Sequence, residues 1–279
     1  MENCDDWHQW QKAVALLSVE FFKDRVPAMR ILFWNVQRLG TGTPGSKQKI
    51  MEQVVAEAFH LHNAEFAVLC EVTSDLELGG VAINKQVVTA KRTAKGTKAQ
   101  LGYAAIDDDL DESVLMRFNP PSFRDVFGTS PWKKGGGEFT KQSKRHVACL
   151  GALNGISLYV YHANASGKAA FLVGWVAEAL HQLHNGSFVL MGDLNCEPAG
   201  LILAMQESGS DLNYFNVAFN GDTHNAKIGV SKTYDYAISG SNVATNVEVL
   251  NIAPAVANFS KSINPLDDIS DHCQIIVTF

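Results

Sequence analysis

The stretch SFVLMGDLNCEP, residues 187–198, is the most informative part of this chain, because it joins an apolar run directly to a polar elbow. A short apolar run followed by Gly is typical of a buried strand, and residues two apart at its end point the same way out of the sheet. Asp193 and Asn195 therefore offer a carboxylate and an amide at the rim of a sheet. Asp, Asn and Pro also make ordinary turns, so other segments have to decide between a turn and a chemical site.

Size and composition indicate a globular protein with one core. The 279 residues are 46% hydrophobic and 19% charged, which suits a layered α/β or two-sheet fold. No apolar run approaches the roughly 20 residues needed to cross a bilayer, and the first residues are acidic where a secretory signal would be basic. We therefore expect no membrane span, and a protein that is cytoplasmic or exported by a route without a cleaved N-terminal signal.

The net charge of −6 excludes a uniformly basic nucleic-acid binder. Two stretches, residues 85–98 and 133–145, are nevertheless rich in Lys and Arg, and they can follow phosphates or simply be solvated surface. Five cysteines without paired short spacing argue against a disulfide framework and against a zinc ribbon. We expect Cys70, Cys149 and Cys273 to be small buried hydrophobes.

The remaining segments predict strands with helices between them. Strands are expected at 30–37, 66–71, 103–106, 113–118, 145–150, 156–162, 187–191, 232–238, 246–252 and 273–279, and helices at 50–61, 171–183 and 201–207. The Asn154-Gly155 pair predicts a hairpin turn. An amphipathic pattern over 7–26 predicts a further helix, which either packs outside the domain, lies on a membrane surface or docks a protein partner. Since we find no repeat or linker, we expect an N-terminal helical extension, residues 1–28, followed by one domain, residues 29–279.

Polar side chains stand at the ends of five predicted strands. These are Asn35 with Gln37, Glu71, His162 with Asn164, Asp193 with Asn195, and Asp271 with His272. If the strands lie in packed sheets, the ends can converge on one rim, where strand termini and loops commonly carry function. A lone histidine at a strand edge is usually a hydrogen-bonded structural residue, but five such ends together favour a site.

Phosphodiester hydrolysis is the chemistry that suits this set of residues. Mg²⁺ binds hard oxygen ligands, usually one or two carboxylates, and Glu71 with Asn35 or Asp271 can supply them. The ion would neutralise the phosphate, and a histidine near its neutral pKa would assist proton transfer or donate to the phosphate. Asp235, within Tyr-Asp-Tyr at 234–236, is placed to orient such a histidine.

The motifs resemble those of a known superfamily. Five of them, at 34–37, 70–71, 192–195, 234–236 and 270–272, occur in the order seen in the endonuclease/exonuclease/phosphatase superfamily, which includes pancreatic deoxyribonuclease and the abasic-site endonucleases. The stretches 162–167, 193–198 and 234–240 also resemble the active subunit of the cytolethal distending toxins. The resemblance implies a deoxyribonuclease-like α/β fold over residues 29–279, a four-layer sandwich of two packed, mainly antiparallel β-sheets with helices outside.

The same resemblance implies a role for each residue. Asp193 would position or activate the attacking water, Asn195 would hold the phosphate, and His272 would bind the scissile phosphate. Asp235 would orient a histidine, and His162 would be a second histidine of the deoxyribonuclease type. The implied set is catalytic His162, Asp193, Asn195, Asp235 and His272, substrate-binding Arg145, Asn164 and Asn195, and metal-binding Asn35, Glu71 and Asp271, with Mg²⁺ as cofactor and Mn²⁺ as the alternative.

One position departs from the toxin pattern. The toxins have Arg after the Asn of the elbow, whereas this chain has Cys196, so one phosphate contact is expected to be missing. The leading hypothesis is a toxin-like, Mg²⁺-dependent DNA endonuclease of low sequence specificity, with DNA as its partner. Two alternatives stay open: a phosphatase of inositol phosphates or phosphoinositides, and a non-catalytic binding protein on the same scaffold that docks through its N-terminal helix.

Overall fold

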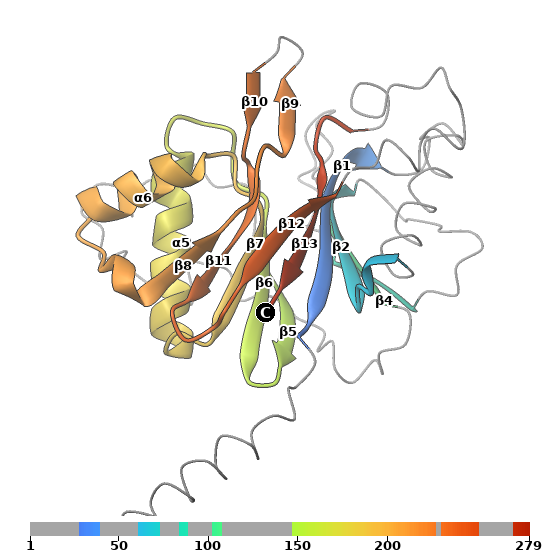
Figure 1. Ribbon diagram of the computed structural model, residues 1–279, viewed down its shortest axis with the longest axis horizontal. Coiled ribbons are helices and arrows are strands. Elements are labelled where there is room, and N and C mark those ends of the chain that lie inside the picture. Colours follow the sequence, from blue (N-terminus) through green and yellow to red (C-terminus); the bar gives the residue numbers. More distant parts are fainter. Residues whose placement is uncertain are drawn as a thin grey trace, which may run out of the picture.

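The computed structural model describes residues 28–39, 61–72, 84–88, 102–107, 147–226, 230–250 and 270–279. Within these ranges two β-sheets pack together, and helices cover the outer face of one of them (Figure 1). The predicted helix at 7–26, the strand at 113–118 and nearly all of the helix at 50–61 lie outside the described residues. The N-terminal extension and its docking role therefore stay predictions.

The first sheet has six strands in the order β12-β13-β1-β2-β4-β3. Only β1 and β2 are parallel, and every other neighbouring pair in this sheet is antiparallel. Its strands are β1 Arg30–Leu39, β2 Phe66–Val72, β3 Asn84–Val88, β4 Gly102–Asp107, β12 Asn246–Leu250 and β13 Gln274–Thr278.

The second sheet has five strands in the order β5-β6-β7-β11-β8, of which only β6 and β7 are parallel. Its strands are β5 Val147–Leu153, β6 Ile156–Tyr161, β7 Phe188–Asp193, β8 Phe215–Ala218 and β11 Asp235–Gly240. The hairpin turn predicted between β5 and β6 is present, with φ 51° at Asn154 and 79° at Gly155.

A separate two-stranded ribbon projects beyond the ends of both sheets (Figure 1). It consists of β9 His224–Ala226 and β10 Val230–Lys232. The prediction of one continuous strand at 232–238 is therefore wrong, because β10 ends at Lys232 and β11 begins at Asp235. The strand is interrupted there because the backbone N–H groups of Tyr234 and Asp235 donate to Thr223 Oγ1, at 3.0 and 2.9 Å, instead of to a neighbouring strand.

Two helices lie on the outer face of the five-stranded sheet. Helix α5, Ala169–His184, connects the parallel strands β6 and β7, as a parallel pair requires. Helix α6, Pro198–Glu207, follows the elbow directly and begins with a proline, whose fixed φ suits the first turn. A short 3-10 helix, η1, spans Leu212–Tyr214.

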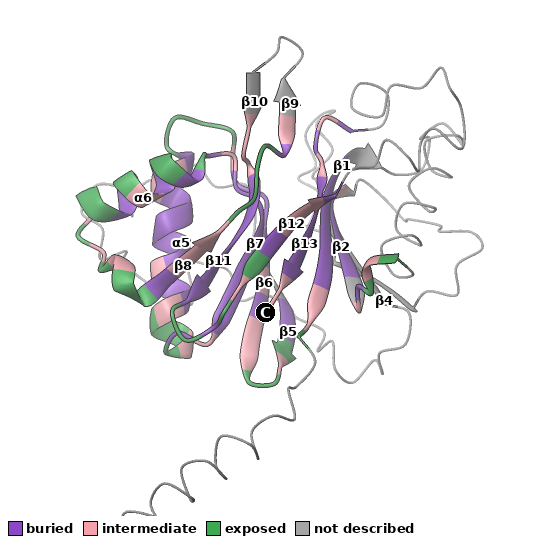
Figure 2. Ribbon diagram, viewed as in Figure 1, coloured by how far each residue is buried: buried purple, intermediate pink, exposed green. Residues whose placement is uncertain are grey.

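Strand β7 is buried on both faces, which explains its continuous apolar sequence. Phe188 and Leu190 pack with the helices in the outer core. Val189 and Met191 instead join the core between the sheets, together with residues such as Val68 and Ile275 of the six-stranded sheet. The central strands β7 and β11 are thus fully buried, whereas β8 and β12 are only partly buried and helix α6 has an exposed outer face (Figure 2).

The packed, mainly antiparallel sheets with helices outside confirm the predicted α/β sandwich. Cys70 is buried as expected, but Cys273 is only partly buried, because it lies just ahead of β13 rather than within it. The side chain of Cys149 lies outside the described set. In the described part of the chain, no helix is long and apolar enough to cross a membrane.

Candidate active site

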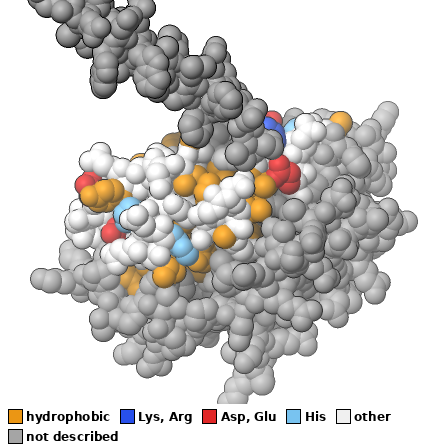
Figure 3. All heavy atoms as spheres, turned by 90° about the horizontal axis from the view of Figure 1, so that it is seen from below, with side chains coloured by type: hydrophobic (Ala, Val, Ile, Leu, Met, Phe, Trp, Pro, Cys, Tyr) orange, Lys and Arg blue, Asp and Glu red, His pale blue; other side chains and the backbone are white. Residues whose placement is uncertain are grey.

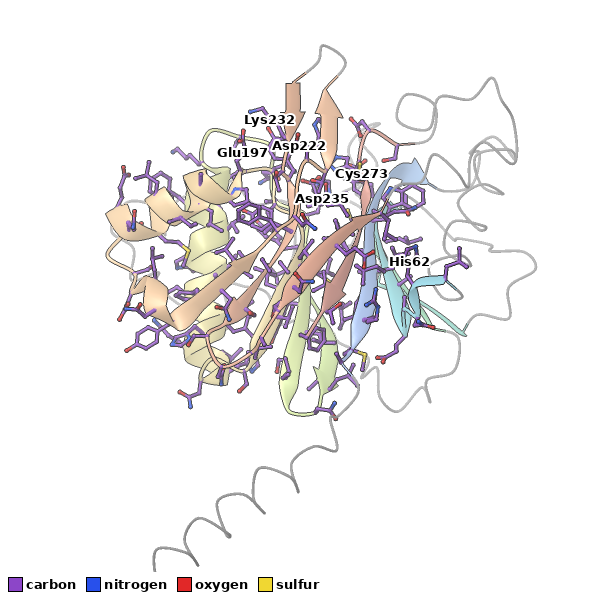
Figure 4. All side chains as sticks on the ribbon, viewed as in Figure 1. His62, Glu197, Asp222, Lys232, Asp235 and Cys273 are labelled. Atoms are coloured by element: carbon purple, nitrogen blue, oxygen red, sulfur yellow. The ribbon has the colours of Figure 1, made fainter. Side chains whose placement is uncertain are left out.

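The polar ends of several strands lie at the same end of the two sheets, called the rim below, because of the directions in which the strands run. The C-terminal ends of the parallel strands β1 and β2 share one edge of their sheet, and those of β6 and β7 share one edge of the other. Because β11 runs antiparallel to β7, it starts at this rim, with Asp235 directly opposite Asp193. Figure 4 shows Asp235, Asp222 and Cys273 together at this end. On the opposite end, the described side chains are largely hydrophobic or uncharged (Figure 3).

The elbow after β7 depends on a glycine. A Cβ at Gly192 would lie 1.8 Å from the carbonyl oxygen of Tyr161, so only glycine lets β7 approach β6 this closely. Asn195 then adopts a left-handed conformation, with φ 49°. Its N–H donates to Asp193 Oδ1 at 3.1 Å, and its Nδ2 donates to the Ala163 carbonyl at 2.9 Å. The elbow is therefore a tight turn that also fixes two polar side chains.

Asp193 is the central carboxylate of the rim and is 2% exposed. Asn35 Nδ2 donates to its Oδ2 at 2.9 Å, and His162 Nε2 lies 3.2 Å from the same oxygen. His272 Nε2 is 3.7 Å away from it. Burial acts to raise the pKa of Asp193, but the hydrogen bond from His162 and the charge of His272 together lower it to about 2. Asp193 is consequently ionised at neutral pH.

His272 is held from both ends. Its Nδ1 lies 2.8 Å from Oδ2 of the fully buried Asp235, while its carbonyl accepts from Trp34 Nε1 at 3.0 Å. Ser270 Oγ accepts from the His272 N–H at 3.1 Å and donates to the Asn35 carbonyl at 2.7 Å. Burial acts to lower the pKa of His272, but nearby carboxylates, Asp235 first among them, raise it to about 10. For Asp235 the effect of burial is the opposite: it raises the pKa of the carboxyl, while the charge of His272 acts to lower it.

Glu71 reaches the rim through an irregularity in β2. The register of β2 against β4 shifts between Cys70 and Val72, and Glu71 has φ 64°. A bulge of this kind redirects a side chain, and a strained non-glycine residue often marks a functional position. Glu71 Oε1 lies 3.6 Å from His162 Nε2. His162 therefore stands between two carboxylates, those of Glu71 and Asp193.

The donor atoms at this rim fit a hard divalent cation. Glu71 offers a carboxylate, and Asn35 offers its amide oxygen, because its Nδ2 is bonded to Asp193. Mg²⁺ takes such oxygen ligands and completes its shell with water and phosphate oxygens. Asp271, the third predicted ligand, has Oδ1 3.7 Å from His272 Nε2 and Oδ2 3.4 Å from His224 Nε2.

This chain is similar to solved structures of known proteins in its fold. No protein-family model and no curated protein matches the sequence. Among solved structures, the chain is similar to cytolethal distending toxin from Actinobacillus actinomycetemcomitans, with 13% identity, a TM-score of 0.56, and 89% of this chain and 97% of that chain covered. It is also similar to TDP2 from Caenorhabditis elegans, with 14% identity and a TM-score of 0.56. The match covers 96% of this chain and 80% of that chain.

A third similar structure is the endonuclease domain of TRAS1, a telomere-specific non-LTR retrotransposon. Here the identity is 11% and the TM-score 0.50, with 91% of this chain and 98% of that chain covered. The protein has the deoxyribonuclease-like fold. The resemblance read from the sequence motifs is thus confirmed for the fold.

Within the deoxyribonuclease-like fold, the rim brings together most of the residues singled out from the sequence. Asn35, Glu71, His162, Asp193, Asn195, Asp235, Asp271 and His272 are joined by the contacts above. Asn164 is partly buried and follows Ala163, to which Asn195 is bonded. Arg145 lies outside the described residues.

Sequence reasoning missed His224 in β9. Its ring packs edge-on against His272, with centroids 4.7 Å apart, and its Nε2 contacts Asp271. No signal could have found it, because β9 has three residues and no periodic pattern.

Cys196, the departure from the toxin pattern, is buried beneath the elbow. Its Sγ lies 3.3 Å from the hydroxyl of Tyr236, and burial raises the pKa of the thiol to about 12. It belongs to the outer core.

Proposed function

We propose that this protein is a divalent-metal-dependent phosphodiesterase, and specifically a DNA endonuclease of low sequence specificity. One observation carries the proposal: a buried, ionised Asp193 contacts Asn35 and His162, next to a His272 that is held by a buried Asp235. A carboxylate flanked by imidazoles, with oxygen ligands for a cation beside it, suits acid–base work on a phosphate ester. The similar folds include nucleases and phosphodiesterases, among them the TRAS1 endonuclease domain.

In the proposed mechanism the cation site consists of Glu71 and Asn35, with Asp271 as a further ligand. Mg²⁺ bound there, or Mn²⁺ in its place, would neutralise phosphate charge as a Lewis acid. Asp193 would take the proton of the attacking water as the water oxygen bonds to phosphorus. The P–O bond to the leaving oxygen breaks, and that oxygen takes up the proton, which Asp193 releases readily because its pKa is about 2. The hydrogen bonds from Asn35 and Asn195 to its two oxygens hold this carboxylate in one orientation.

The histidines act on the phosphate in this scheme. His272 donates from Nε2 to the scissile phosphate, because its Nδ1 is bonded to Asp235 and the ring cannot turn. His162 presents Nε2 between Glu71 and Asp193 and supports the proton transfer. Asn195, Asn164 and Arg145 are proposed to bind the remaining phosphate oxygens. The basic stretches 85–98 and 133–145 would contact the DNA backbone at sites without sequence preference.

The proposal is tested by nicking of supercoiled plasmid in Mg²⁺ or Mn²⁺, run beside phosphate release from inositol phosphates. The wild-type protein should nick plasmid, and Asp193→Ala and His272→Ala should lose activity by at least about 100-fold. His62→Ala is a suitable control, since His62 precedes β2 and lies away from the rim (Figure 4). Equal nicking by wild type and both rim variants would overturn the proposal.

The two alternatives give different results in the same experiment. Phosphate release from inositol substrates without plasmid nicking would assign the rim to a phosphatase of inositol phosphates or phosphoinositides. No activity on either substrate, together with a melting temperature that no divalent metal raises, would favour a non-catalytic binding protein, because a ligand of the folded state must stabilise it.

A further inference from the structure

His224, Asp271 and His272 form a ligand group beside the proposed catalytic residues. His224 belongs to β9, and the other two residues directly precede β13. One potential ligand atom from each residue lies within 4.8 Å of the others. An isolated antiparallel bridge also joins the backbones of His224 and His272, and the N–H of Cys273 donates to the Thr223 carbonyl at 2.7 Å. The backbone thus fixes the three side chains next to one another.

The separations suit a small metal ion. With metal–ligand bonds of roughly 2.1 Å, neighbouring atoms of a tetrahedral shell lie roughly 3.4 Å apart. His224 Nε2 is 3.4 Å from Asp271 Oδ2, and His272 Nε2 is 3.7 Å from Asp271 Oδ1. The two rings meet at an interplanar angle of 68°, as rings that radiate from a shared ion can.

The surroundings of His272 are those of a metal ligand. Histidines that bind metals almost always donate their second ring nitrogen to a carboxylate or carbonyl, which fixes the tautomer. His272 Nδ1 makes this contact with Asp235 Oδ2 at 2.8 Å. Asp235 is in turn fixed through its backbone N–H, which donates to Thr223 Oγ1. His272 therefore presents Nε2 to the group from a rigid ring.

The ligand types select a class of ion. Two imidazoles and one carboxylate suit zinc and related transition metals, whereas Mg²⁺ prefers oxygen ligands alone. The group therefore differs in chemistry from the Glu71 and Asn35 pair. Both sites would meet at His272, whose Nε2 is the atom proposed above to bind phosphate.

We propose that His224, Asp271 and His272 bind a transition-metal ion of the Zn²⁺ class, which displaces the Nε2 proton of His272 to solvent, and that the bound ion inhibits the phosphodiesterase by occupying that nitrogen. The binding stands on geometry alone, and only the inhibition rests on the proposed function. His224 is the residue specific to this second site, while Asp271 and His272 also belong to the first.

Titration of the full chain with Co²⁺ tests the binding without any need for activity. In excess Mg²⁺, the wild-type protein should bind one equivalent with visible absorption bands, which Zn²⁺ then removes. His224→Phe keeps a ring against His272 but lacks the nitrogen ligand, so it should weaken Co²⁺ and Zn²⁺ binding by at least about tenfold. His62→Ala should bind Co²⁺ and Zn²⁺ as the wild type does, since His62 lies beside Glu248 and not beside the three ligands. Equal affinity of His224→Phe and wild type would overturn the site.

Plasmid nicking in Mg²⁺ with added Zn²⁺ tests the inhibition. Measured relative to its own rate without Zn²⁺, His224→Phe should need at least about tenfold more Zn²⁺ than the wild type for half-inhibition. Identical Zn²⁺ sensitivity of the two proteins would overturn the inhibition. If the wild type does not nick at all, the proposed function fails, while the Co²⁺ titration still decides the metal site.

Discussion

Asp193 shows at the residue scale why one motif could not separate a turn from a site. Its Oδ1 accepts from the N–H of Asn195, as an ordinary turn-forming Asp does. Its Oδ2 lies within 3.2 Å of Asn35 Nδ2, from β1, and of His162 Nε2, which directly follows β6. Oδ1 therefore accounts for the turn, whereas Oδ2 carries the contacts on which the proposed site depends.

The pair of His272 and Asp235 leads to a prediction for the metal-free protein. Because folding raises the pKa of His272 from 6.5 to about 10, the protonated ring stabilises the fold. This contribution is complete below pH 6.5 and is lost as the pH rises through about 10. Asp235→Asn should lower the pKa of His272 by at least about one unit, measured by NMR of the imidazole resonances. An unchanged pKa would show that Asp235 is not the main cause of the shift.

The limits of sequence reasoning about residues have a physical origin. Residues of the motifs could be found because they lie at or near the ends of strands with a strong apolar pattern, as Glu71 does in β2. The partner of each residue could not be found, since it depends on strand order. The surroundings of His224 and Cys196 could not be predicted either, because their neighbours, His272 and Tyr236, are distant in the sequence.

At the scale of elements, β6 and β7 decide the shape of the rim. Their parallel pairing requires the crossover through α5, and their close approach requires Gly192 at the end of β7. Long apolar strands such as β7 were predictable from sequence. The ribbon of β9 and β10 was not, because strands of three residues carry no measurable period.

Substitution of two glycines, one tightly packed and one with open space around it, tests whether β7 and β6 need a glycine between them. Gly192→Ala would place a Cβ 1.8 Å from the Tyr161 carbonyl oxygen, so the free energy of unfolding should fall by at least about 2 kcal/mol. Gly200→Ala is the matched control, because it lies in α6 with nothing within 4 Å of its Cβ. It should leave stability unchanged or raise it by about 0.5–1 kcal/mol. Urea unfolding of both variants would contradict the account if Gly192→Ala were as stable as Gly200→Ala.

At the scale of the whole molecule, two sheets place their polar ends at one edge of the sandwich. The fold class followed from the sequence because the strands are strongly apolar and the motifs occur in a known order. The sequence allowed the strand ends to converge if the sheets pack, but it did not predict the contact between Asn35 in β1 and Asp193 at the end of β7, since these residues come from different sheets. Only packing of one sheet on the other brings them into contact.

A cation at this rim should stabilise the entire fold. At roughly 100 times its dissociation constant, Mg²⁺ would add about 2.7 kcal/mol to the free energy of unfolding and raise the melting temperature by several degrees. Glu71→Gln should abolish most of this shift. Glu207→Gln, a similar change at the exposed end of α6, should retain it. A full shift in Glu71→Gln would remove Glu71 from the cation site.

The most direct test of the central claim is the single-turnover rate of duplex DNA cleavage by Asp193→Asn in saturating Mg²⁺. This change keeps the shape of the side chain and removes the charge that accepts the proton. Asp222→Asn is the matched control, because Asp222 is exposed at the same rim (Figure 4). The account predicts a loss of at least about 100-fold for Asp193→Asn and little change for the control. Cleavage by Asp193→Asn at the rate of the control would contradict a catalytic role for this carboxylate.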